Sequence, residues 1–421
     1  MNEVTFLEST GISFYNPDEK GILLTEKLLN SKQEFFLIQA PQGVMLRAGK
    51  VDESEELLGS IEIKFIDALN VAVQKWIPLP YSRKAAAEVS PSKSNDWIRL
   101  FISRPPLSME DYLFNFVFAV DTSVQDNVPH GLKGSDCVGF FTSEMGLPFE
   151  AHSSSTSFLS SSTLRTWVEN IFKKVAFTGY ENPPSFGLAL AAFMTLIEGL
   201  KKEGILPVVS IIQSEGESVD VHLILDLGNS RACGIIAENE KGKPIQLDEC
   251  KKLEIRDLSN PALTYTEPFD TSFKFYPSPF SSAENPLSGA NFRWPSILRL
   301  GSEAAKMESS LVGRTGLSSP KRYLWSNALE NYPWYFNLAD DSQGQKINSP
   351  FFSSLDEFGN YKGDAGAPPF EPRYPTSSMM TFLMLEILNH ARAQINSCDY
   401  RKFRGRMRAR QVLKSIVITT P

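Results

Sequence analysis

Apolar runs separated by polar turns organise the first half of the chain. Four short runs are rich in β-branched and aromatic residues, with Pro, Gly, Asp and Asn between them, and they predict strands at residues 35–39, 60–65, 97–102 and 114–120. Two later stretches repeat apolar residues at helical spacing and predict helices over about 164–175 and 185–204, the second closed by Gly204. Strands and helices in one region predict an α/β domain over residues 1–215.

A different pattern begins after residue 215. A strand over residues 219–226 becomes fully apolar before it ends in Asp226, a tight polar turn follows, and residues 232–237 form a second apolar strand. Two apolar strands joined by so short a glycine-containing turn predict a β-hairpin. A third strand is predicted near residues 253–255, and an amphipathic helix over residues 379–396.

Long stretches without a clear period interrupt this second half. Residues 258–295 are rich in Pro, Ser and Phe, and residues 331–375 are similarly irregular. Connections of that length are uncommon in compact domains, so both stretches predict functional insertions or wrapping loops. The chain ends in an apolar run at residues 415–420 that is typical of a buried strand. Because a domain does not normally end on a central strand, we expect the sequence to be an N-terminal portion of a longer protein.

Composition narrows the class of protein. The 421 residues are 42% hydrophobic and 22% charged, as in globular proteins, and no run of about 18 apolar residues predicts a membrane span. The formal net charge of -7 argues against nucleic acid as a partner, since phosphate binding needs a basic footprint. The cysteines lie far apart, which argues against a disulfide framework or a structural zinc site. The N-terminus lacks a signal-peptide pattern, so a cytoplasmic location is expected, with secretion without a cleaved signal left open.

One dense basic run departs from this acidic balance. It occupies residues 401–410 and is rich in arginine. Such a run either binds an anionic partner or forms the solvated face of a linker, and both interpretations stay open.

The turn of the predicted hairpin carries the residues with the clearest chemistry. It reads Asp226-Leu227-Gly228-Asn229-Ser230-Arg231. Gly228 is expected to supply a positive φ, and its missing side chain would let a phosphate approach successive backbone N–H groups that form an anion nest. Asn229 and Ser230 add side-chain donors, and Asp226 at the strand end can hold a hydrated Mg²⁺. The alternative is an ordinary hairpin whose Asp and Asn cap the turn.

This turn resembles the first phosphate motif of the Hsp70, actin and sugar-kinase superfamily. The similarity covers residues 225–235, and further landmarks follow in the order that Hsp70 ATPase domains show. They are Pro295-Ser296-Ile297-Leu298, Gly301-Ser302-Glu303-Ala304-Ala305-Lys306, Pro320-Lys321-Arg322-Tyr323-Leu324, the helix at 379–396, and Val417-Ile418-Thr419-Thr420-Pro421. The resemblance implies a ribonuclease-H-like, actin-like first lobe over residues 216–421. That lobe is expected to be incomplete, because the second phosphate motif and the adenosine motif would lie beyond Pro421.

The resemblance also implies roles for single residues and a cofactor, Mg²⁺-ATP. Asp226 would position Mg²⁺ through water, residues 226–231 would bracket the β- and γ-phosphates, and Lys321 takes the place of a catalytic lysine. The alternative for Lys321 is a surface lysine. Arg231 departs from the Hsp70 pattern and would contact phosphate or pair with an acidic neighbour. With half of the site missing, little or no ATP turnover is expected from residues 1–421.

A closer resemblance is to the SrfB family, large bacterial proteins associated with virulence. It rests on Asp226-Leu227-Gly228-Asn229-Ser230-Arg231 with Cys233-Gly234, on Arg293-Trp294-Pro295-Ser296, and on Ser318-Ser319-Pro320-Lys321-Arg322-Tyr323-Leu324-Trp325. It implies a virulence-associated protein that binds Mg²⁺-ATP, with hydrolysis left open, and that contacts an unidentified protein partner.

Two other functions fit the sequence. The first is a non-enzymatic scaffold or effector with a degenerate nucleotide site, which Phe280, Trp334 and Phe351 would favour as exposed aromatic residues. The second is a sugar or small-molecule kinase, which would share the first hairpin but would need a substrate aspartate in the missing half.

Overall fold

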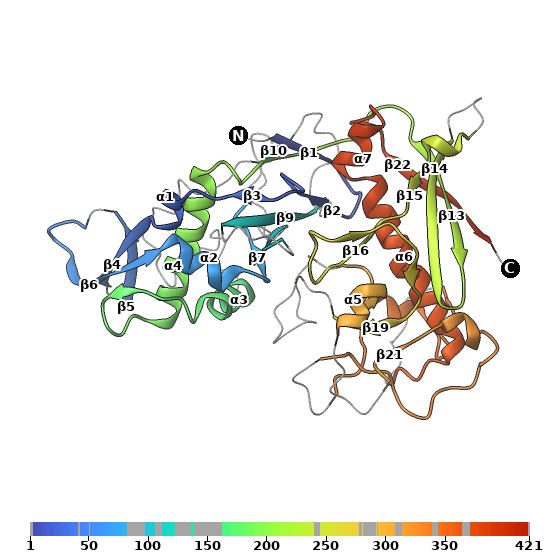
Figure 1. Ribbon diagram of the computed structural model, residues 1–421. Coiled ribbons are helices and arrows are strands. Elements are labelled where there is room, and N and C mark those ends of the chain that lie inside the picture. Colours follow the sequence, from blue (N-terminus) through green and yellow to red (C-terminus); the bar gives the residue numbers. More distant parts are fainter. Residues whose placement is uncertain are drawn as a thin grey trace. The chain divides into compact units, whose positions relative to one another are not determined.

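The computed structural model of the chain divides into two compact units (Figure 1). Unit 1 is Met1–Gln213 and unit 2 is Ser214–Pro421. Within them the structure describes residues 3–40, 43–49, 51–81, 97–105, 112–122, 136–138, 162–239, 245–277, 280, 292, 294–307, 314–338, 344–363 and 371–419. Arg293, Thr420 and Pro421, which belong to the motifs above, lie outside these residues, as does most of 278–293.

Unit 1 combines several sheets with helices that cover them. Its strands are β1 (Glu3–Leu7), β2 (Ile12–Tyr15), β3 (Ile22–Leu23), β4 (Lys32–Ala40), β5 (Gly43–Ala48), β6 (Glu56–Lys64), β7 (Trp76–Pro78), β8 (Ile98–Ser103), β9 (Leu113–Asp121), β10 (Asp136–Val138), β11 (Thr178–Gly179) and β12 (Val208–Ile212). Its helices are α1 (Glu26–Leu29), α2 (Phe65–Ala72), α3 (Ser162–Phe172) and α4 (Ser185–Lys202). The sheets have the orders β11-β6-β4-β5, β2-β9-β8-β7 with β3 beside β9, and β1-β12-β10.

The periodic segments of unit 1 form the predicted elements. The four predicted strands fall on β4, β6, β8 and β9, and the two predicted helices on α3 and α4. β6 stops at Lys64, one residue earlier than predicted, because Phe65 begins α2. Helix α4 begins at Ser185 as expected, and Gly204, with φ of 68°, takes the left-handed conformation just after the helix. The apolar stripe of α4 is buried, and Phe193 packs against Phe172 of α3 with ring centroids 6.1 Å apart.

The main sheet of unit 2 is built around the predicted hairpin. Its strands are β13 (Val219–Leu227), β14 (Arg231–Asn239), β15 (Lys251–Lys252), β18 (Phe269–Asp270) and β22 (Gln411–Thr419). β13 pairs antiparallel with β14 and parallel with β22, so residues far apart in sequence meet across one sheet. Alternate residues of β13 are buried on one face, in the core that also contains α6 (Met379–Ile395; Figure 1). The predicted hairpin, helix and terminal strand are confirmed.

Strand β22 differs from its prediction in burial. An apolar strand was expected to be buried, but Ile416, Val417 and Ile418 are all exposed. Within the described residues β22 is the last strand of its sheet, with β13 on one side, so no neighbour covers its other edge. The apolar pattern therefore predicts the strand correctly and its burial wrongly.

The two long irregular stretches build the core of unit 2 instead of looping away from it. These stretches and the segments beside them contain β16 (Ile255–Arg256), β17 (Thr264–Tyr265), β19 (Phe273–Phe275), β20 (Leu298–Leu300), α5 (Gly301–Lys306) and β21 (Gly316–Leu317). Short 3-10 turns occur at η2 (Leu247–Glu249), η3 (Pro320–Tyr323), η4 (Pro350–Ser354) and η5 (Thr376–Ser378), and α7 (Cys398–Phe403) follows α6.

Aromatic residues from these stretches surround α6. Phe275, Phe352 and Tyr374 each lie within 6.0 Å of Phe382 on α6, measured between ring centroids. Trp334 is fully buried, and its indole N–H donates to Tyr374 O at 2.8 Å. Such edge-to-face contacts and buried indole hydrogen bonds stabilise a core.

The expectation of exposed aromatics in these stretches is wrong. Phe280 and Trp334 are fully buried, and Phe351 is partly buried against the core. Among the described residues, no helix combines the length and apolar character needed to cross a membrane.

Candidate functional site

The loop between β13 and β14 is closed tightly by Gly228. The Gly228 N–H donates to Arg231 O at 2.9 Å. The prediction of a positive φ is wrong, because Gly228 does not lie in the left-handed region. Glycine is required for a different reason: a Cβ atom at this position would lie 2.6 Å from Arg231 O. The close approach of two backbone segments therefore selects the residue.

Thr271 holds this loop from the protein side. Its N–H donates to Ser230 O at 3.0 Å and its hydroxyl to Asn229 O at 2.8 Å, and the residue is 1% exposed. In a trans peptide the N–H of the next residue points opposite to the carbonyl. The N–H groups of Ser230 and Arg231 therefore point away from Thr271. Two successive N–H groups directed to one side have the arrangement of an anion nest.

Asp226 lies on the exposed side of the sheet, next to this nest. It faces Thr419 of β22 across the parallel pair, and the Thr419 hydroxyl donates to Asp226 Oδ1 at 3.2 Å. This is the only hydrogen bond to the carboxylate from the residues that the structure describes, so Oδ2 remains available to water or a cation. The side chain is exposed at the end of β13, as the sequence predicted.

Lys321 reaches the same loop from a distant part of the chain. Its ammonium donates to Leu227 O, with 2.7 Å between Nζ and the oxygen. The 3-10 turn η3 presents it, and Ser319 just before η3 has a left-handed φ of 54° that turns the chain. Lys321 is half-buried with a defined partner, unlike an ordinary surface lysine.

Arg231 has an acidic partner at the loop. Its Nε lies 3.5 Å from Asp270 Oδ1, and the two side chains are 72% and 55% exposed. An ion pair so exposed contributes little to stability, about 0–1 kcal/mol. Of the two predicted roles for Arg231, pairing with an acidic neighbour is the one that the structure contains.

The start of α5 lies beside the strand that carries Asp270. The Gly301 N–H donates to Ser272 O at 3.0 Å, and Gly301 has φ of 60°. A Cβ at Gly301 would meet Phe269 Cβ at 3.5 Å. The glycine of the Gly-x-x-Ala-Lys landmark thus adjoins the segment that holds the loop. Lys306, the lysine of the same landmark, points elsewhere and pairs with Asp257 at 2.9 Å.

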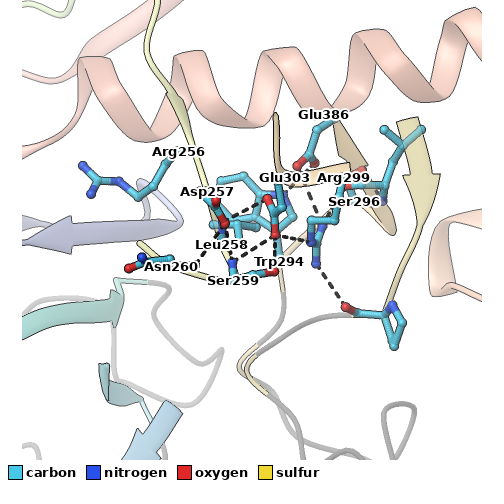
Figure 2. Close-up of polar contacts among 12 residues, drawn as sticks. Arg256, Asp257, Leu258, Ser259, Asn260, Trp294, Ser296, Arg299, Glu303 and Glu386 are labelled. Atoms are coloured by element: carbon cyan, nitrogen blue, oxygen red, sulfur yellow. Dashed lines mark hydrogen bonds and ion pairs between the residues drawn. The ribbon is translucent and has the colours of Figure 1, made fainter. Parts of the chain in front are cut away.

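A buried cluster of charges beside α6 was missed by the sequence analysis (Figure 2). Glu386 of α6 is fully buried and accepts a hydrogen bond from the Trp294 indole at 2.7 Å. Arg299 of β20 is also fully buried, with its NH1 3.8 Å from Glu386 Oε1. Arg299 further donates to the carbonyls of Leu298, at 2.6 Å, and Pro277, at 3.1 Å. The guanidinium therefore joins β20, α6 and the chain that precedes residue 278.

His390 fixes the other side of Glu386. The Arg256 N–H donates to His390 Nδ1 at 3.3 Å, so the ring proton sits on Nε2, which donates to Glu386 Oε1 at 3.1 Å. Burial alone would raise the pKa of Glu386. The contacts with His390 and Trp294 and the charge of Arg299 outweigh it and hold this pKa below its usual value.

Glu303 ties α5 to the segment after β16 (Figure 2). Its carboxylate accepts the Leu258 N–H at 3.0 Å, the Ser259 N–H at 2.9 Å and the Ser259 hydroxyl at 2.6 Å. Arg299 Nε lies 3.7 Å away. Burial nevertheless raises the pKa of Glu303 to about 7, and the nearby charge of Asp257 acts in the same direction.

This cluster is a structural centre more than a reactive one. Its carboxylates are occupied by protein donors, and among the described residues no group of three or more His, Cys, Asp and Glu side chains could hold a metal ion. One sequence signal pointed to it: Glu386 and His390 are four residues apart, at helical spacing within the apolar helix 379–396. A buried polar pair at that spacing requires partners from elsewhere in the fold.

The basic run at 401–410 is folded onto unit 2. Its arginines pair with acidic residues: Arg404 with Glu238 at 3.4 Å, Arg406 with Glu238 at 3.3 Å, and Arg408 with Glu215. Arg401 is fully buried and donates to Asn396 O at 3.2 Å. The run is therefore not a linker, because α7 and these ion pairs attach it to the unit, but much of it faces solvent as expected, including Arg408 at 59% exposure.

No curated protein and no solved structure matches the chain. One family model does, that of the virulence factor SrfB, and the match covers residues 8–421. A match over nearly the full length shows the family. The chain therefore belongs to the SrfB virulence factor family.

Proposed function

We propose that unit 2 binds Mg²⁺-ATP at residues 226–231, as the first lobe of an actin-like nucleotide-binding domain. One observation carries the proposal: three kinds of group converge on a single turn. The N–H groups of Ser230 and Arg231 point away from Thr271, the Lys321 ammonium contacts Leu227, and Asp226 lies near the end of β13. N–H and ammonium groups suit phosphate oxygens, and a carboxylate suits a hydrated Mg²⁺.

The sheet of unit 2 supports the fold named in this proposal. The resemblance to Hsp70 requires a helix and a strand that return to the first hairpin after a long connection. Helix α6 lies in the core under β13, and β22 pairs in parallel with β13 so that Thr419 is opposite Asp226. Lys321 also returns to the hairpin from its distant place in the chain.

The residues at the loop fit a magnesium–phosphate group and not an all-protein metal cage. Mg²⁺ keeps most of its waters and takes one or two carboxylates, which a lone exposed Asp226 can supply. Bound Mg²⁺ would neutralise phosphate charge. The chain itself would orient the phosphates through the loop N–H groups and hold them with Lys321, whose ammonium is positioned by the Leu227 carbonyl.

Calorimetric titration with Mg²⁺-ATP tests the proposal. Wild-type protein is expected to bind with a Kd below about 1 mM, and Asp226→Ala to weaken binding by about tenfold or more. Asp220→Ala is the matched control, because Asp220 lies on the same strand and makes an exposed contact with Lys414 at 4.0 Å. Equal affinities for wild type and Asp226→Ala, or no binding by wild type, would contradict the proposal.

A protein-contact scaffold is a second candidate, favoured by the segment that follows Lys321. Leu324, Trp325 and Tyr332 are exposed, the last two to 77% and 73%. Neighbouring exposed apolar side chains mark contact surfaces. This candidate predicts no nucleotide binding, together with self-association in sedimentation experiments that Trp325→Ser abolishes. A monomeric wild-type protein that binds Mg²⁺-ATP would exclude it.

A further inference from the structure

Among the described residues, few contacts other than those of Thr271 restrain the loop at residues 228–230. The Gly228 N–H bonds Arg231 O, and the exposed Arg231–Asp270 ion pair adds little. The hydrogen bonds that fix the two central peptide planes come from one residue, Thr271, whose N–H takes Ser230 O and whose hydroxyl takes Asn229 O. These two bonds decide which way the next two N–H groups point.

We infer that Thr271 is a positioning residue for an anion nest made by the N–H groups of Ser230 and Arg231. In an extended strand successive carbonyls point to opposite sides, and so do successive N–H groups. Here both carbonyls are drawn to one residue, so both N–H groups face the other side. The free-energy cost of aligning them is met in the folded protein before any anion arrives, which favours binding.

Burial makes this arrangement stable. Thr271 is 1% exposed, so its hydroxyl cannot exchange its partner for water. Its neighbour Ser272 is held in turn, because Ser272 O accepts the Gly301 N–H at 3.0 Å. The Thr271 hydroxyl is therefore fixed by β18 and by the start of α5, and its hydrogen bond to Asn229 O fixes the loop in turn.

Only the ligand assigned to the nest, the phosphates of Mg²⁺-ATP, rests on the proposed function. The positioning role can be measured without any ligand. Amide hydrogen exchange on the full chain reports on the Gly228 and Thr271 N–H groups, both of which donate to the loop or within it. Loss of one buried hydrogen bond should lower their protection by about tenfold.

The test compares Thr271→Val and Thr271→Ala with two controls. Both variants remove the hydroxyl, and the alanine variant keeps the experiment informative if the valine variant does not fold. Thr271→Ser retains the hydroxyl, and Asp270→Asn removes only the exposed ion pair, so both should keep wild-type protection. Unchanged protection in the folded Val or Ala variant, or an equal loss in the Ser variant, would overturn the inference.

Titration with Mg²⁺-ATP separates this inference from the proposed function. If both hold, the variants without the hydroxyl lose affinity by about the same factor as protection, and Thr271→Ser restores it. If protection falls while the wild type binds no nucleotide, Thr271 positions the loop and the proposed ligand is wrong. If the wild type binds and the variants bind equally well, Thr271 has no positioning role in binding.

Discussion

The ammonium of Lys321 lies 2.7 Å from the carbonyl oxygen of Leu227, 94 residues earlier in the chain. That carbonyl ends β13, at the point where the strand gives way to the Gly228 turn. The contact places a positive charge at the turn that follows Asp226 and carries the Ser230 and Arg231 N–H groups. It is the relationship on which the proposed nucleotide site depends.

Replacement of Lys321 by Met should weaken Mg²⁺-ATP binding by about tenfold or more, because a charged donor to phosphate is lost. Arg322→Met is the matched control: Arg322 is the exposed neighbour on the same turn and should be replaceable without effect. Calorimetric titration of both variants checks the prediction. An equal loss of affinity in the two variants would mean that general positive charge, and not the position of Lys321, attracts the nucleotide.

Glu386→Gln should destabilise unit 2 by about 3 kcal/mol, because it removes one of the two carboxylates beside the buried Arg299 charge and leaves only Glu303. Gln can still accept the Trp294 indole N–H, so the loss of stability measures the effect of removing the negative charge of Glu386. Trp294→Phe removes that hydrogen bond and part of the buried ring that contacts His390, so it should cost at least about 1–3 kcal/mol. Urea unfolding curves give the two values. A double variant Glu386→Gln, Arg299→Met should recover part of the loss, and additive losses would show that the two residues are not coupled.

Glu303 should make the stability of unit 2 depend on pH. Its folded pKa is raised to about 7 from an ordinary 4.5, so its stabilising contribution is complete below pH 4.5 and is lost as the pH rises to about 7. The unfolding free energy should therefore fall by roughly 2 kcal/mol between about pH 5 and pH 7.5, relative to Glu303→Gln. Glu386, with a lowered pKa, acts in the opposite direction and only at lower pH. Urea unfolding at several pH values measures the difference, and parallel curves for both proteins would contradict it.

Two glycines of α4 should respond oppositely to alanine. At Gly199 a Cβ would lie 2.2 Å from the ring of Phe65, so Gly199→Ala should destabilise unit 1 by about 1–3 kcal/mol through overpacking. At Gly187 the nearest atom is 3.8 Å away, so Gly187→Ala should stabilise the helix by up to about 1 kcal/mol. Thermal unfolding of the two variants decides the matter. A melting temperature that does not fall in Gly199→Ala would show that the α4–α2 contact is not as close as described, and one that falls in Gly187→Ala would contradict the open space at that position.

The local sequence pattern predicted the helices and strands of this fold better than it predicted their burial and packing. The alternation along β13 and the helical spacing of α4 and α6 each bury one face, and such faces can be read from sequence. The burial of β22 could not be, because an apolar strand has the same pattern at the edge of a sheet as at its centre. The aromatic stretches were misjudged because their packing on Phe382 is non-local and has no period.

The residues of the candidate site could be predicted from the sequence, but the contacts that hold them in place could not. The turn from Asp226 to Arg231 carried a local signal. Thr271 carried none, since it follows a two-residue strand 40 residues away from the loop that it holds, and only pairing of β18 with β14 brings it there. The reason why glycine is needed at position 228 could not be predicted either, because a close approach of two backbone segments is a property of the folded turn.

The most direct measurement is the change in backbone amide chemical shifts when Mg²⁺-ATP is added to the protein. The largest shifts are expected at the N–H groups of Ser230 and Arg231, because those groups would donate to phosphate, with a smaller effect on Gly228. Saturation without any shift at these residues, or shifts confined to another part of the chain, would contradict a nucleotide site at this loop.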